Sequence, residues 1–199
     1  MVRPRKNLSS SDTATLLRAR ALIHFGRFGF ANTSLFDVAE DVGVTRTSLL
    51  YHFKSKEKLY DAVVQEAFFQ ISSELVNSLR GHGSFTERLE RMIASFLGYV
   101  ENHPDLAKLL IREVIDERDA GCKMIVNQGL PILNLVIKFI LFAGKVRRDR
   151  KDFLREILLQ ITTSVMLKSA SGQMRETVWG KNSRTRDLAR LLLTEFNSN

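Results

Sequence analysis

The chain has 199 residues, of which 44% are hydrophobic and 26% are charged, a composition typical of a folded globular protein, so pervasive disorder is excluded. The 30 basic and 22 acidic residues give a net charge of +8, and the single cysteine excludes both an internal disulfide and a multi-thiolate metal cage. Ten basic and five acidic residues lie within positions 1–60, an excess that fits a polyanionic partner or simply a solvated basic surface.

The N-terminal sequence predicts no secretion signal, because no apolar segment follows its basic residues. Arg3, Arg5 and Lys6 leave two interpretations open, an arm that reaches DNA or a plain basic tail. The most apolar stretch, Gly129–Gly144, is interrupted by Lys138 and is too short to span a bilayer. We therefore expect a cytoplasmic protein that does not contact membranes.

Apolar residues recur at helical spacing in chain order, and no run of alternating β-branched residues indicates a strand. The sequence predicts an all-α protein of about nine helices. The first helix begins near Asp12 and ends at Gly29, and short helices follow as far as Leu59. A long helix runs from about Lys56 to Leu79 and ends at a glycine-rich break.

Further amphipathic helices are predicted beyond this break. Pro104 suits the first turn of one of them, and Gly129 with Pro131 should bend or split another. The predicted ranges are 86–101, 104–116, 120–142, 151–169 and 184–196.

Residues 35–53 have the spacing of a helix-turn-helix unit. Ala39 is small where the two helices cross, and Gly43, four residues later, permits the positive φ of the turn. Ser34 and Thr45 are suitable N-caps for the two helices. The remaining core positions of this unit are apolar, namely Val38, Val42, Val44 and Leu49.

The second helix of such a unit enters the major groove of DNA. If Leu49 is buried, then Thr47 and Tyr51 face outward and Arg46 lies at the N-terminal edge, where arginine can bind guanine. His52, Lys54 and Lys56 follow, where a cation suits phosphate oxygens. The alternative to DNA contact is that Tyr51 and His52 only pack within the protein and that Lys54 and Lys58 are solvated charges.

The segment from Ala21 to Leu59 resembles the DNA-binding domain of the TetR family of bacterial transcriptional regulators. The resemblance rests on Phe25, Gly29-Phe30, Thr33-Ser34, Val38-Ala39-Glu40, Gly43-Val44 and the run from His52 to Glu57. It implies a three-helix DNA-binding head, residues 1–55, and a helical effector-binding and dimerisation body, residues 56–199.

The resemblance also implies roles for individual residues. The base-reading positions of the family correspond to Arg46, Thr47, Ser48 and Tyr51, and its phosphate contacts correspond to Ser34, His52 and Lys56. Many members have a tyrosine where this chain has Leu50, so Tyr51 either replaces that phosphate contact or reads a base.

An effector site and a dimer interface are expected in the body. The candidate pocket walls are aromatic and apolar residues of the middle helices, which could equally be plain core: Phe68, Phe69, Phe96, Tyr99, Leu110, Val114 and Phe139. The candidate interface lies on the last two long helices, unless both faces are buried within one monomer: Phe153, Ile157, Leu158, Ile161, Val165, Leu188, Leu191, Leu192 and Phe196.

The predicted function is a homodimeric, ligand-responsive regulator that is released from a palindromic operator by a small, largely apolar effector. Repression is the family's usual mode rather than a deduction from this sequence. The four histidines have no metal-ligand spacing, and no nucleotide-binding or hydrolase motif is present, so neither an enzyme nor a cofactor is expected. The alternatives are a DNA-binding protein without an effector, acting architecturally or as an activator, and a protein-interaction adaptor.

Overall fold

A computed structural model describes residues 9–116, 119–180 and 187 of the chain. Within these residues the fold is all-α, as expected, with nine α-helices, one short 3-10 helix and no strand. The helices are α1 (Ser10–Asn32), α2 (Leu35–Val42), α3 (Arg46–Phe53), α4 (Lys56–Leu79), α5 (Phe85–Asn102), α6 (Pro104–Ile115), α7 (Asp119–Ala143), η1 (Arg148–Arg150), α8 (Lys151–Ala170) and α9 (Met174–Trp179).

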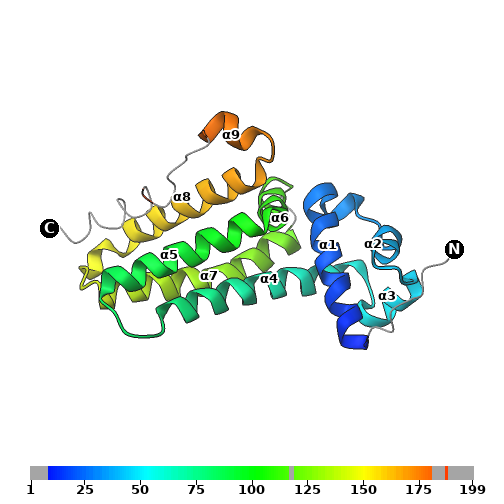
Figure 1. Ribbon diagram of the computed structural model, residues 1–199, viewed down its shortest axis with the longest axis horizontal. Helices are drawn as coiled ribbons and strands as arrows, with labels where there is room; N and C mark the ends of the chain where they lie inside the picture. The colour runs from blue at the N-terminus through cyan, green and yellow to red at the C-terminus, as the bar shows by residue number, and fades with distance from the viewer. Residues whose placement is uncertain (1–8, 117–118, 181–186, 188–199) are drawn as a thin grey trace.

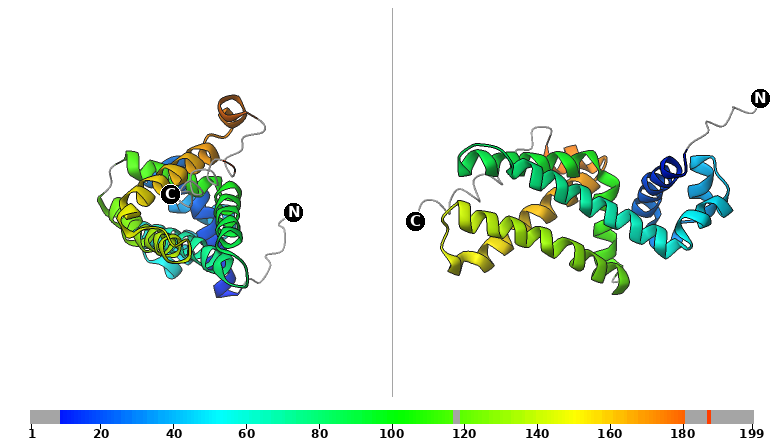
Figure 2. Two further views of the ribbon diagram at one scale, coloured as in Figure 1. Left: turned by 90° about the vertical axis from the view of Figure 1, so that its left-hand side faces the viewer. Right: turned by 90° about the horizontal axis from the view of Figure 1, so that it is seen from below.

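The molecule is elongated, with a head of three helices at one end (Figure 1). Helices α1, α2 and α3 form this head, and α4 to α8 form a body in which several long helices run side by side. The view from below also places the head at one end of the body, with α4 leading from one into the other (Figure 2). A change in the position of α4 would therefore be transmitted directly to the head.

One hydrophobic core extends through both parts. Leu17 of α1 and Leu49 of α3 are fully buried in the head, and Leu154 of α8 is fully buried at the other side of the same cluster. Tyr60 connects the two parts, because its ring packs edge-on against Phe25 of α1 at 5.0 Å while its backbone belongs to α4. The head and the body are thus packed together and are not joined by a free linker.

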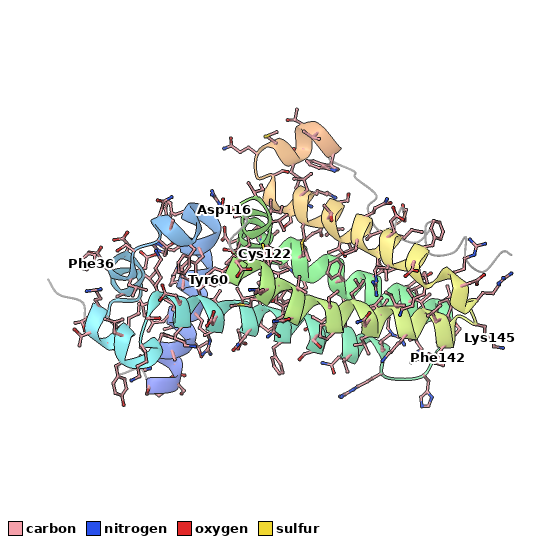
Figure 3. The ribbon with its side chains drawn as sticks, turned by 180° about the vertical axis from the view of Figure 1, so that it is seen from behind. Phe36, Tyr60, Asp116, Cys122, Phe142 and Lys145 are labelled. Atoms are coloured by element: carbon pink, nitrogen blue, oxygen red, sulfur yellow. The ribbon has the colours of Figure 1, made fainter. Side chains whose placement is uncertain are left out.

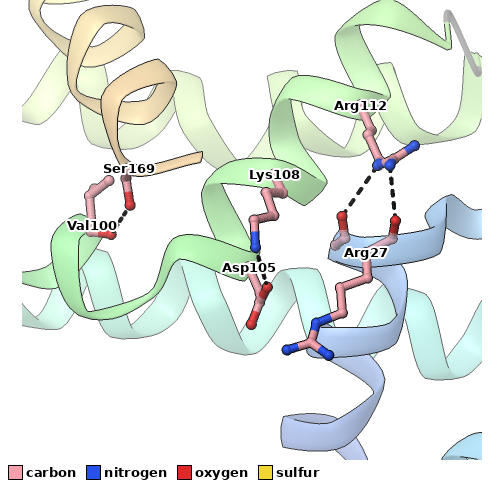
Figure 4. A network of polar contacts seen from close by, with 7 residues as sticks. Arg27, Val100, Asp105, Lys108, Arg112 and Ser169 are labelled. Carbon is pink, nitrogen blue, oxygen red and sulfur yellow. Dashed lines mark hydrogen bonds and ion pairs between the residues drawn. The ribbon is translucent and has the colours of Figure 1, made fainter. Parts of the chain in front are cut away.

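Helix α6 also holds the head directly. A Cβ atom at Gly26 of α1 would overlap the backbone carbonyl of Asp105, so the two helices approach each other closely here. Helical geometry in α1 is interrupted at Gly29, which leaves carbonyls of the preceding turn available. The Arg112 guanidinium donates to the carbonyls of Gly26 and Arg27, at 3.2 and 2.9 Å (Figure 4).

Several element boundaries differ from those expected. Helix α1 passes through Gly29 as a kink and ends at Asn32, because a turn resumes beyond the glycine. Helix α7 is neither split nor ended at Gly129 and Pro131. Helix α9 was not predicted, whereas the predicted helix 184–196 and the basic start at Arg3, Arg5 and Lys6 lie outside the described residues.

The stretch judged too short for a bilayer is part of a longer helix. Helix α7 begins at Asp119, and its 25 residues are long and apolar enough to cross a membrane by length and composition alone, so the argument from length was wrong. Val136, Ile137 and Ile140 of α7 are buried in the protein, and the helix packs against α4, α6 and α8. Only 22% of its most apolar 18-residue stretch is buried in the described structure, so most of that stretch is accessible.

Candidate nucleic-acid interface

Helices α2 and α3 form the helix-turn-helix unit that the residue spacing predicts. Gly43 adopts a left-handed conformation, with φ of 78°, and its N–H donates to the carbonyl of Glu40 at 2.9 Å. Ala39 is 1% exposed at the helix crossing, where a larger side chain would separate the helices. The Ser34 and Thr45 hydroxyls accept backbone N–H groups of their own helices, as N-caps do. Local hydrogen bonds therefore set the angle at which α3 leaves the turn.

Helix α3 has one buried face and one outward face. Leu49 and Phe53 are buried against the rest of the head. Arg46 and Thr47 are exposed on the outward face, and Tyr51 is 73% exposed. Ser48 and His52 are half-buried along the edge between the faces, and Thr45 is exposed at the helix start. The outward face is therefore unobstructed by the described part of the chain, as entry into a groove requires.

A surface groove of about 810 Å³ lies beside the start of α3. It is lined by three basic residues, Arg46, Lys54 and Lys56, and by no acidic residue. The other lining residues come from the start of α2, from α3 and from the turn before α4: Ser34, Leu35, Phe36, Leu50 and Ser55. This cation-rich groove brings together two of the three expected phosphate contacts, Ser34 and Lys56, while His52 lies outside the lining.

The two lysines of the groove differ in their surroundings. The Lys56 ammonium donates to the carbonyl of Ala31 at 2.9 Å and lies 4.8 Å from the ring centre of Phe30, so it fastens the end of α1 to the start of α4. Lys54 is exposed at the end of α3, with its ammonium 5.4 Å from the ring centre of Tyr51. The geometry thus favours Lys54 over Lys56 as the cation available to a phosphate.

Tyr51 and Leu50 occupy different sites. Leu50 is half-buried and lines the groove, whereas the Tyr51 ring is directed outward between Lys54 and the edge of the His52 ring, 5.5 Å away. Tyr51 therefore does not fill the position at which many relatives have a tyrosine. It lies instead on the face that also presents Arg46 and Thr47.

A hydrogen bond between two side chains braces the head behind this face. The His24 Nε2 of α1 lies 2.8 Å from the Asp41 carboxylate of α2. A hydrogen bond from His24, followed by the positive charges of His24, Arg20 and Arg27, lowers the pKa of Asp41 below its usual value. The pair joins α1 to α2 and so supports the scaffold on which α3 rests.

The expected pocket walls do not share one cavity face. Phe69 and Val114 are 68% and 67% exposed, because each lies on the outward side of its helix, and their role as pocket walls stays a prediction. Phe68 and Leu110 are buried in the core, and Phe96 and Phe139 are half-buried.

Tyr99 is the pocket candidate with the most defined polar contacts. Its hydroxyl lies 3.0 Å from Oε1 of Gln70, and its ring stacks on His103 at 4.2 Å. Burial, with the nearby carboxylates of Glu66 and Glu74, raises the pKa of Tyr99 to about 12, so the hydroxyl remains a hydrogen-bond donor at neutral pH.

The expected interface on α8 stays a prediction, and its residues are divided between core and surface. Ile157 and Val165 are 7% and 3% exposed and belong to the core of this protomer, because α8 turns them towards the other body helices. Leu158 and Ile161 are half-buried, and Phe153 is 50% exposed. The remaining candidates lie outside the described residues: Leu188, Leu191, Leu192 and Phe196.

Two outward-facing leucines on α8 were missed. Leu159 and Leu167 are each 49% exposed, and with Trp179 they line a groove of about 620 Å³. Thr163 lies between them, so the three residues follow a four-residue spacing that puts them on one helix face. This spacing is readable from the sequence, but the broader apolar stripe beside it masked the signal.

Comparison with known proteins agrees with this geometry. A model of bacterial regulatory proteins of the tetR family matches residues 17–63, which span most of the head and the start of α4. The HTH-type transcriptional regulator RutR of Escherichia coli K12 is 30% identical over 148 residues, covering 73% of this chain and 67% of RutR. The nucleoid occlusion factor SlmA of Aliivibrio fischeri is 24% identical over 159 residues and 80% of each chain.

Solved structures share the fold at lower identity. A TetR-like transcriptional regulator from Rhodococcus sp. RHA1 matches over 100% of both chains with a TM-score of 0.72 and 18% identity. The fatty acid degradation regulator FadR of Bacillus halodurans matches 90% of this chain and 97% of its own, with a TM-score of 0.71 and 14% identity. The family match and the 30% identity to RutR, of which the chain covers 67%, show that the chain belongs to the TetR family of DNA-binding transcriptional regulators.

Proposed function

We propose that this regulator is a cytoplasmic homodimeric repressor that binds a palindromic operator and is released by a small, largely apolar effector. The observation that carries the proposal is the outward face of α3, where Arg46, Thr47 and Tyr51 are exposed beside the cation-rich groove. In this proposal residues 1–55 read DNA, and residues 56–199 bind the effector and the partner subunit.

The bases are read by the exposed residues of α3. Arg46 begins the helix and can donate two hydrogen bonds to O6 and N7 of a guanine, while Thr47 and Tyr51 lie further along the same face. Ser34 and Lys54, which both line the groove, hold phosphates and fix the register of the helix. Ser48 and His52, which are less exposed, contribute at the edge of this surface.

The second head is supplied by a partner subunit packed on the outer face of α8. Phe153, Leu159 and Leu167 are about half exposed on this one helix, and together they offer apolar surface that another protein surface could bury. A two-fold axis at α8 would pair this helix with its copy and place two heads on one duplex. Half-sites one helical turn apart would then be read together.

Effector release would act through the contacts between head and body. Arg112 of α6 holds two carbonyls of α1, and the close approach at Gly26 leaves no space between the two helices (Figure 4). A ligand that bound better to a body with α6 displaced would shift the position of α1 and of the whole head. The coupling would correspond to about 1–3 kcal/mol, the usual range for such linkage.

The experiment selects tight-binding duplexes from a random-sequence pool and measures affinity by fluorescence anisotropy over a range of salt concentrations. Specific binding that weakens steeply with salt is expected, and Arg46→Ala should lose the preference for the selected sequence, by about 1–3 kcal/mol. The matched control is Arg175→Ala, which removes a half-buried arginine of α9 that pairs with Glu101, away from α3. Retention of every sequence at one affinity would overturn the proposal.

A regulator without an effector is the second candidate. Phe68 and Leu110 are part of a continuous core, and the pocket candidates Phe69 and Val114 face solvent. This arrangement favours a body that dimerises without binding an effector. Unfolding temperatures measured across a library of small apolar compounds separate the two candidates. A compound that raises the temperature and also releases the selected duplex supports the effector-responsive form.

A further inference from the structure

Phe36 is an exposed aromatic residue within the cation-rich groove. It is the second residue of α2, and 58% of its surface is exposed. Its ring lies at the outer end of the head (Figure 3). Single exposed apolar side chains are common on proteins, but this one shares a groove with the basic residues Arg46 and Lys54.

The position of Phe36 relative to α3 indicates which part of the duplex it meets. Arg46 is the first residue of α3, and both Arg46 and Phe36 line the same groove. If α3 lies in the major groove with its first residues at the base edges and α2 crosses the backbone, then the groove shared with Arg46 puts Phe36 at the rim of the major groove, near the bases that Arg46 reads. This step rests on the proposed function, since it assumes that the outward face of α3 binds DNA.

The chemistry of the major groove indicates which DNA group the Phe36 ring can contact. Hydrogen-bond donors and acceptors cover the base edges there, and the C5-methyl group of thymine is the apolar group among them. A phenyl ring has no donor or acceptor with which to read a polar edge, whereas contact with a methyl removes apolar surface of both partners from water. Leu35 and Leu50 also line the groove, so Phe36 is one of three apolar residues there.

We propose that Phe36 is a specificity-determining residue that recognises a thymine methyl group in each operator half-site, beside the base pair contacted by Arg46. The contact lies on α2 and not on the recognition helix. It adds a sequence preference that the residues of α3 alone do not supply.

The test uses duplexes from the random-pool selection in which each thymine is replaced, one position at a time, by uracil. Uracil keeps the base pairing and removes only the methyl group. Loss of the methyl from one half-site should weaken binding by the wild-type protein about fourfold at one position, the effect of one buried methyl. The Phe36→Ala variant should bind the thymine and uracil duplexes equally, while Phe36→Leu retains part of the difference.

Two controls isolate the contact. Phe142→Ala removes a 72% exposed ring at the end of α7, far from the head, and should leave the thymine preference unchanged (Figure 3). Circular dichroism melting should show that Phe36→Ala folds as the parent does, because the ring lies outside the core.

The outcomes are distinguishable. Equal loss of affinity for thymine and uracil duplexes in Phe36→Ala would overturn the inference in favour of a backbone contact, and a wild type insensitive to every replacement would overturn it as well. If no duplex is selected above the non-specific level, the proposed function itself fails.

Discussion

The head and the body of this regulator differ in how their functional surfaces are determined. In the head, side chains close in sequence set the geometry. The Thr45 hydroxyl accepts a hydrogen bond from the N–H of Ser48, three residues later, and Gly43 forms the turn between α2 and α3. In the body, the contacts that matter join distant segments, such as Arg112 with Gly26 and Ser169 with Val100 (Figure 4). The proposed DNA-reading surface is thus determined by local contacts, whereas the proposed effector and partner surfaces depend on how whole helices pack.

The largest expected effect tests whether the two regions are nonetheless one folding unit. Leu49→Ala in the head and Ile140→Ala in the body each delete a fully or almost fully buried side chain of the hydrophobic core. Each should lower the free energy of unfolding by about 2–5 kcal/mol. Because Tyr60 packs against α1 from α4, urea unfolding followed by circular dichroism should remain a single transition in both variants.

The matched control is Leu159→Ala on the exposed face of α8, which should cost little in the monomer. A separate low-urea transition in Leu49→Ala alone would mean that the head unfolds independently of the body. The head and the body would then have to be treated as two domains that fold independently.

A smaller effect is expected at the junction. Gly26→Ala places a methyl group against the backbone carbonyl of Asp105, and backbone atoms cannot rotate away as a side chain can. The substitution should destabilise the protein by about 1–3 kcal/mol, measured by thermal unfolding. It should also alter DNA affinity, since α1 must shift from α6 to make room.

Gly98→Ala is the control for the junction, because a Cβ at Gly98 meets no atom within 4 Å. If Gly26→Ala were as stable as the parent, α1 and α6 would be free to separate. That result would contradict the inference that the head and the body are tightly packed together through α1 and α6.

These contrasts explain how far the sequence alone could lead. The caps at Ser34 and Thr45, the turn at Gly43 and the buried Ala39 were predicted correctly, because each depends on neighbours within a few residues and belongs to a recurring motif. Whether a lysine in the adjoining turn is available to DNA was not predictable, since the partner of Lys56 is the carbonyl of Ala31, 25 residues earlier in the chain.

In the body, the helices were predictable but their orientations were not. Periodicity identifies an apolar stripe without saying which neighbour covers it. Val114 therefore seemed equivalent to Leu110 in the same helix, although the structure exposes the first and buries the second. On α8, Ile157 packs inward while Leu159 faces out, and only the packed helices distinguish them.

The two groove lysines provide a finer test within the head. Lys54→Ala should reduce the slope of log affinity against log salt by about one unit and leave stability unchanged, because its ammonium is exposed. Lys56→Ala should instead lower the free energy of unfolding by about 1 kcal/mol through loss of its bond to Ala31, with little change in slope. Anisotropy titrations and thermal melts measure the two effects, and a reversed pattern would restore Lys56 as the phosphate contact.

The smallest expected effect concerns the brace between α1 and α2. The hydrogen bond from His24 holds the pKa of Asp41 below its usual value in the folded protein. A carboxyl with a depressed pKa stabilises the fold above its unfolded pKa of about 3.9 and loses that contribution as pH falls through the folded value. The Asp41→Asn variant should therefore be less stable than the parent at neutral pH, and the difference should shrink below about pH 4.

Thermal melts of both proteins across this acid range measure the contribution of the pair. Asp61→Asn, at the exposed ion pair with Lys58 on α4, is the matched control and should show a weaker dependence. Because the contact between His24 and Asp41 connects α1 with α2, its loss should also make the orientation of α3 less fixed. The preference for the selected duplex should weaken as a result. A pH profile identical in parent and Asp41→Asn would show that local caps alone orient α3, which would make the head still more independent of its long-range contacts.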